Sequence, residues 1–133
     1  MFLRHLTAEQ KKALLVLAYH MVIADDHVSD EESALLDELK HDLGVNVVVT
    51  PQELFERPSA AVFDSRESKM TALVQILSLA FADNRFPPSE SEMVRDFTRE
   101  LRIPAKEMPS IEAWARQHIR LLEDFEALLA GAD

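Results

Sequence analysis

The sequence predicts an all-α fold: a compact helical domain built from two pseudo-repeated helix-loop-helix units, a short connector helix and a long C-terminal helix. Apolar residues recur at three- and four-residue spacing over long stretches, and an offset of 58 positions relates two parts of the chain. Only the short segment 45–49 is rich in β-branched residues. Because it has no second strand signal to pair with, we expect extended chain there and no sheet.

The repeat is seen in pairs of residues that lie 58 positions apart. Two acidic pairs match their own kind, Asp25 with Asp83 and Glu32 with Glu90. The apolar pairs include Leu15 with Leu73, Leu36 with Val94, Leu39 with Phe97 and Leu43 with Leu101. Self-similarity at a fixed offset indicates two copies of one supersecondary unit.

A length of 133 residues suits one domain with four parts. We expect the first repeat at about 7–45, the connector at 46–64, the second repeat at about 65–103 and the C-terminal helix at about 109–130. Capping boxes are predicted at three helix starts, formed by Thr7 with Gln10, Ser29 with Glu32 and Thr50 with Glu53. Gly44 suits the end of a helix and Pro88 the first turn of one.

The predicted C-terminal helix has no counterpart in the repeat. Its apolar stripe consists of Ile111, Trp114, His118, Leu121, Leu122, Phe125, Leu128 and Leu129. Two interpretations stay open. The helix covers the repeated pair as part of the core, or it joins another subunit, which makes the protein a homodimer.

Composition excludes several functions. With 14 Lys plus Arg against 24 Asp plus Glu, the net charge is −10, which argues against nucleic acid and anionic lipid as partners. The chain has no cysteine and two glycines, so it lacks a thiolate nucleophile, a Cys-type zinc site and a glycine-rich phosphate loop. We therefore expect neither enzyme activity nor a required cofactor.

Two apolar runs, 13–24 and 71–82, are too short to cross a bilayer, which takes about 20 apolar residues. The first run follows Lys11 and Lys12 in the sequence but contains the polar side chains of Tyr19 and His20. The second run lies in the middle of the chain. Both are interpreted as buried helices. The expectation is a cytoplasmic protein without direct membrane insertion.

Negative charge concentrates between Asp25 and Asp42, where eight acidic residues stand against Lys40 alone. The acids at 30–32 suit a helix start, because the macrodipole stabilises negative charge there. Asp25 and Asp83 instead end apolar helices, where the macrodipole is unfavourable.

Two explanations for these aspartates stay open. One is local capping by an Asx turn; the other is a divalent cation shared with the glutamate seven residues later. The candidate metal ligands are Asp25, Asp26, Asp30 and Glu32. Because the second copy has Arg85 in place of His27, a metal should favour the first loop, and the pairs Asp25–Glu32 and Asp83–Glu90 are interpreted as structural ties.

The repeated loop resembles the signature of the TerB-like family of tellurite-resistance proteins, Ala-Asp-Gly-x-(apolar)-x-x-x-Glu between two helices. Here it reads Ala-Asp-Asp-His-Val-Ser-Asp-Glu-Glu from Ala24 and Ala-Asp-Asn-Arg-Phe-Pro-Pro-Ser-Glu from Ala82, so the signature glycine is Asp26 in one copy and Asn84 in the other. The resemblance covers roughly residues 14–103. It implies a bacterial, cytoplasmic, all-helical and non-enzymatic protein of the tellurite and stress response, with membrane-bound partners and acidic residues that bind metal ions.

The leading hypothesis is a non-catalytic interaction module whose acidic face, around the first loop and the second helix, meets a basic protein partner. The alternative is a divalent-metal sensor or sequestering protein that uses the acidic first loop.

Overall fold

The computed structural model describes residues 3–24, 30–44, 49–56, 58–82 and 88–131, and within these ranges all regular structure is helical. The α-helices are α1 (Ala8–Ala24), α2 (Asp30–Leu43), α3 (Pro51–Phe55), α4 (Arg66–Phe81), α5 (Pro88–Glu100) and α6 (Met108–Leu129). Short 3₁₀ turns are η1 (Leu3–His5), η2 (Ala60–Val62) and η3 (Ala105–Glu107). The predicted all-α fold with a connector helix and a long C-terminal helix is confirmed.

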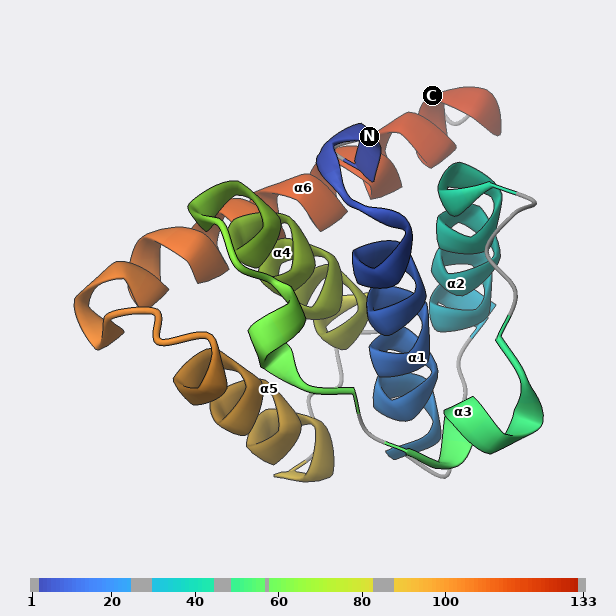
Figure 1. Ribbon diagram of the computed structural model, residues 1–133. Coiled ribbons are helices and arrows are strands. Elements are labelled where there is room, and N and C mark those ends of the chain that lie inside the picture. The colour runs from blue at the N-terminus through green and yellow to red at the C-terminus, as the bar shows by residue number, and fades with distance from the viewer. Residues whose placement is uncertain (1–2, 25–29, 45–48, 57, 83–87, 132–133) are drawn as a thin grey trace.

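Helices α1 and α4 lie side by side at the centre of the molecule (Figure 1). Helix α2 packs against α1, and α5 packs against α4. Each outer helix also contacts the central helix of the other hairpin, so that α2 contacts α4 and α5 contacts α1. The connector elements α3 and η2 contact α1, whereas α6 packs along α4. The two predicted hairpins therefore pack against each other, with their first helices at the centre of the contact.

The 58-residue offset is preserved in the helix boundaries. Helix α1 begins at Ala8 and α4 at Arg66, while α2 begins at Asp30 and α5 at Pro88. The start of each hairpin is thus in register with the other. The helix starts therefore repeat at the same 58-residue offset as the sequence pattern.

Capping boxes begin both central helices at equivalent positions. Thr7 Oγ1 accepts a hydrogen bond from the Gln10 amide at 3.2 Å, and Gln10 Oε1 accepts one from the Thr7 amide at 2.9 Å. Ser65 and Ser68 form the same reciprocal pair at the start of α4. The Gln10 side chain also donates to the carbonyl oxygen of Val62 at 3.0 Å and so joins α1 to the connector.

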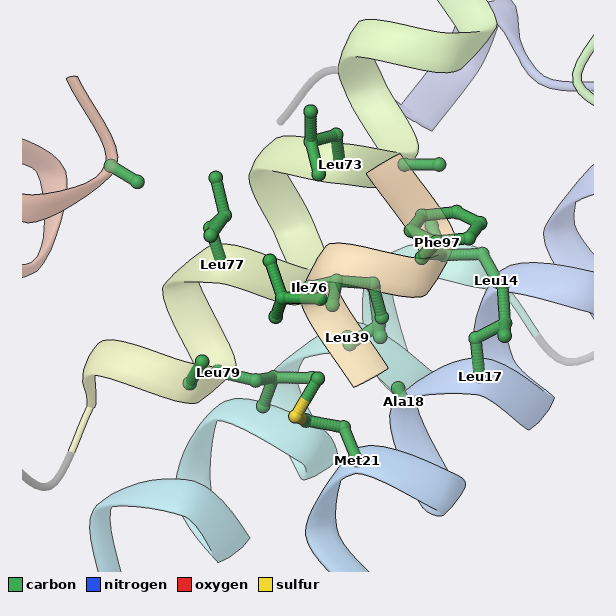
Figure 2. Close-up of a cluster of buried hydrophobic side chains, with 14 of the residues drawn as sticks. Leu14, Leu17, Ala18, Met21, Leu39, Leu73, Ile76, Leu77, Leu79 and Phe97 are labelled. Atoms are coloured by element: carbon green, nitrogen blue, oxygen red, sulfur yellow. The ribbon is translucent and has the colours of Figure 1, made fainter. Parts of the chain in front are cut away.

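The hydrophobic core lies between these central helices and their flanks. Every side chain is buried from Ala13 to Ala18 in α1 and from Ile76 to Phe81 in α4. Figure 2 shows this cluster, with Leu14, Met21, Leu39, Leu73, Ile76, Leu77 and Phe97 among its labelled members. A helix that is buried on most of its faces cannot show a narrow apolar stripe, which explains why α1 and α4 read as nearly continuous apolar runs.

The connector follows the sequence prediction. Thr50 and Glu53 form a capping box, Pro51 opens the helix, and α3 ends at Phe55. Gly44 lies at φ 94° just after α2, as expected of a residue that ends a helix. The segment predicted to be extended, 45–49, falls largely on residues 45–48, which lie outside the described residues. The predicted capping residue Ser29 lies outside them as well.

None of the described helices combines the length and the apolar character that a membrane crossing requires.

Candidate functional site

The acidic residues that the sequence singles out fall mostly outside the described part of the structure. Asp25, Asp26 and Asp83 lie outside the described residues, as do the side chains of Glu32 and Glu90. The Asp25–Glu32 and Asp83–Glu90 pairs and the four-residue metal site therefore stay predictions. Asp30 is described and is exposed at the first position of α2. Within the described residues, no cluster of three or more His, Cys, Asp or Glu side chains is placed to hold a metal ion.

The described part of the acidic face belongs to α2. Its leucines Leu36, Leu39 and Leu43 are buried. Asp30 and Asp37 lie seven residues apart on the side of the helix that faces away from these leucines, and both are exposed. Helix α2 thus presents a charged outer surface while its opposite side packs into the core.

A second row of acids on α2 lies beside α6. Glu38 and Asp42 line a small depression together with His118 and Leu122 of α6. Both acidic residues are exposed. The negative charge of α2 therefore extends from the outer surface to the space between α2 and α6.

Three depressions lie along α6, and we call them together the α6 groove. The first lies beside Trp114, with His5 of η1 and Met70 of α4 opposite; its volume is about 290 Å³. The second holds Ser78 of α4 and His118, with a volume of about 80 Å³. The third, of about 230 Å³, lies between Leu35 and Ala34 of α2 and Phe125 and Leu129 of α6. The second and third depressions share Leu35, Glu38 and Leu122.

The C-terminal half of α6 leaves large apolar side chains in solvent. Leu121 is 70% exposed, Phe125 56%, Leu128 74% and Leu129 71%. By contrast Ile111, Ala115 and Ile119 of the same helix are buried. Of these three buried residues only Ile111 belongs to the stripe predicted from the sequence, so α6 packs through a face next to that stripe and leaves most of the stripe uncovered.

Carboxylates lie along the edges of the groove. They come from both sides: Glu67, Glu38 and Asp42 from α4 and α2, and Glu123 and Glu126 from α6. No lysine or arginine is among the described residues that line the three depressions. The groove thus combines an apolar floor with negatively charged edges.

His118 lies half-buried in the middle of the groove. Burial lowers the pKa of its imidazole, while the nearby carboxylate of Glu38 acts in the opposite direction and the N-terminal amine adds slightly to the lowering. The imidazole ring meets the Trp114 indole edge to face, with ring centroids 5.2 Å apart. A pKa below the ordinary value leaves His118 neutral at pH 7, so it does not offset the negative edges.

Ser78, like Gln75 of the same helix, is a further polar residue at this point. It lies within the apolar helix α4, and its buried hydroxyl finds no hydrogen-bond partner among the described residues. A buried hydroxyl without a partner is destabilising. Ser78 therefore adds to the groove one hydroxyl that has no partner among the described residues.

His20 packs between α1 and α3. It is half-buried in α1, and its Nε2 donates to the carbonyl oxygen of Leu54 in α3 at 2.6 Å. His27, the one histidine in the acidic loop, lies outside the described residues.

Sequence reasoning named the residues of α6 but missed those that form the opposite side of the groove. Leu35 and Ser78 were given no place in a site, and Glu38 was counted in the acidic face of the second helix but was not placed beside the C-terminal helix. The available signal was Ile119, which lies outside the predicted stripe and widens the apolar surface of α6 beyond one face.

Comparisons with protein-family models, with curated proteins and with solved structures find no match. The TerB-like resemblance therefore rests on the repeated loop motif.

Proposed function

We propose that this chain is a non-catalytic interaction module of the TerB-like type, which presents the acidic side of α2 and the adjoining α6 groove to a basic protein partner. The observation that carries the proposal is the juxtaposition of Glu38 and Asp42 of α2 with the exposed apolar residues of α6, notably Phe125 and Leu129.

Exposed apolar area supports a binding role. Large contiguous apolar patches rimmed by polar groups are typical of surfaces that bind another molecule. Here four large side chains on the last turns of α6 are each more than half exposed. Burying one such side chain stabilises a complex by about 1.5–3 kcal/mol before the costs of association are subtracted.

Charge supports the choice of a basic partner. The chain has a net charge of −10, and α2 alone contains six acidic residues against one lysine. Complementary charge accelerates association and excludes partners of like charge. The TerB-like resemblance adds the biological setting that we propose: a bacterial, cytoplasmic stress-response role, of the tellurite-resistance type, with a membrane-associated complex as partner.

Charge reversal on two equivalent helices tests this function. We would isolate cross-linked complexes from host cells with the wild type, with Glu38→Lys plus Asp42→Lys on α2, and with Asp96→Lys plus Glu100→Lys at the equivalent positions of α5. All four positions are exposed, and the two double variants change the net charge equally. A specific partner should be recovered with the wild type and the α5 variant and lost with the α2 variant. Recovery of the same partner with all three proteins would refute the proposal.

The alternative function, a divalent-metal sensor or sequestering protein using Asp25, Asp26, Asp30 and Glu32, rests on the sequence pattern. Titration of calcium, magnesium, zinc and manganese against melting temperature tests it. A concentration-dependent rise that Asp25→Asn abolishes would favour the metal function.

A further inference from the structure

Resting on the proposed function, we propose that the occupant of the α6 groove is an amphipathic helix of the partner protein. Its apolar stripe enters the three depressions, and its lysines or arginines contact the carboxylates at their edges.

The length of the groove suits a helix. Trp114 lines its first depression and Leu129 its third, and fifteen residues of α-helix span about 22 Å. The depressions follow one another at intervals of about one to two helical turns along α6. A docked helix presents side chains at i, i+3 or i+4 and i+7 at the same intervals.

The walls of the groove are helices as well. Helix α6 forms one side, and the opposite side is formed in turn by η1, α4 and α2. The hollow at the third depression, between Leu35 and Phe125, receives apolar side chains from a helix lying parallel to α6. Exposed Leu121 and Leu128 extend the apolar contact beyond the depressions.

Charge decides which helix fits. Carboxylates line both sides, from Glu67 near the first depression to Glu123 and Glu126 at the third. Glu67 already lies 3.2 Å from His5 Nε2. By contrast, an apolar helix without basic residues would partly desolvate Glu123 and Glu126 without supplying a positive charge, which is costly. Lysine or arginine on the flanks of the bound helix supplies the compensating charge.

The same charges disfavour two other occupants. A second copy of this chain brings its own net charge of −10 and the same acidic edges. A second copy would need basic side chains to pair with these edges, and α6 has two arginines. One of them, Arg116, already packs over the Phe81 ring, with its guanidinium carbon 4.0 Å from the ring centroid. An anionic membrane surface is repelled for the same reason.

Two labelled peptides of about 16 residues, made of leucine and lysine, test the proposal. One has leucines at i, i+3, i+4 and i+7 and the other has the same composition in scrambled order, so that both have equal charge. Fluorescence anisotropy with the 133-residue chain gives the Kd. We expect the amphipathic peptide to bind about tenfold more tightly than the scrambled one, because only it has an apolar face. Binding should also shift the emission of Trp114, the only tryptophan of the chain.

Matched variants locate the binding site. Phe125→Asp in the groove should weaken binding of the amphipathic peptide about tenfold, whereas Phe55→Asp on α3 should leave it within about twofold. Both phenylalanines are exposed, at 56% and 88%, so neither change removes core packing. Leu129→Asp is a second groove variant, and circular dichroism verifies that each variant folds.

Three results would overturn the inference. Equal affinity for both peptides would mean attraction by charge alone, and equal affinity of Phe125→Asp and wild type would place the binding elsewhere. Self-association in sedimentation velocity that Phe125→Asp abolishes would make a second copy the occupant. The proposed function fails separately, when the α2 charge-reversal variant still recovers the same partner from cells.

Discussion

Gly44 and Arg102 occupy equivalent positions in the two hairpins, 58 residues apart, and both adopt positive φ, of 94° and 60°. Each follows the last helix of its hairpin. The Gly44 amide donates to the carbonyl oxygen of His41 at 3.2 Å, and the Arg102 amide donates to that of Arg99 at 3.0 Å. Because a side chain in the left-handed region costs about 1–2 kcal/mol, only the second hairpin ends with backbone strain.

Exchanging glycine at these two positions should have opposite effects. Arg102→Gly should raise the free energy of unfolding by about 0.5–1 kcal/mol, since relief of strain exceeds the added entropy of the unfolded chain. Gly44→Ala should lower it by about 1 kcal/mol. A Cβ at Gly44 meets no atom within 4 Å, so that loss comes from the backbone conformation and not from a clash. Urea denaturation measures both values, and changes of the same sign would contradict the assignment.

The two equivalent capping boxes should contribute similarly to stability. Thr7→Ala and Ser65→Ala should each lower the free energy of unfolding by about 1 kcal/mol, because each leaves a helix amide without its acceptor. Ser33→Ala, at an exposed position of α2, is the control and should remain within about 0.5 kcal/mol of the wild type. If the cap variants match the control in urea denaturation, the capping bonds contribute nothing.

Two buried serines of α4 should respond oppositely to replacement by alanine. The Ser78 hydroxyl has no partner among the described residues, so Ser78→Ala should raise the free energy of unfolding by about 1 kcal/mol. Ser68 is equally buried, but its hydroxyl bonds with Ser65, so Ser68→Ala should lower it by about 1 kcal/mol. Calorimetry provides the test. A loss of stability with Ser78→Ala would mean that its hydroxyl has a partner in solution.

His118 should make stability depend on pH. Because burial lowers its pKa in the folded protein, the unfolded chain binds the proton first as pH falls. The contribution of His118 is therefore complete above about pH 6.5 and is lost as pH falls through the lowered pKa, and the carboxylate of Glu38 limits the loss.

His118→Gln should reduce this decline when melting temperature is followed from about pH 7.5 to pH 5.5. His41→Gln, at an exposed position of α2, is the control. A decline of equal slope in the wild type and in His118→Gln would show that another group is responsible.

Local signals in the sequence were sufficient to place the helices. Thr7 with Gln10 and Thr50 with Glu53 begin helices where the capping pattern predicts. The positive φ of Arg102 was not predictable from its residue type, which gives no sign of a left-handed position, although its equivalence to Gly44 was available in the repeat.

The groove could not be found from local pattern. Periodicity placed Leu121, which is exposed, in the apolar stripe of α6 and left out Ile119, which is buried, because the buried face depends on where α4 and α2 lie. The acidic loop residues that motivated a metal site, Asp25 and Asp26, lie outside the described residues. The metal-site hypothesis for these two residues rests on the sequence pattern alone.

The parts of the chain outside the repeat make the two halves of the molecule unlike. Helix α6 packs along α4, while the corresponding helix α1 is contacted by α3 and η2. A bare duplicate of hairpins would display two interchangeable sides and would accommodate two ligands. Because α6 packs on one side alone, the two sides of the molecule differ. The expected stoichiometry is therefore one bound helix per chain.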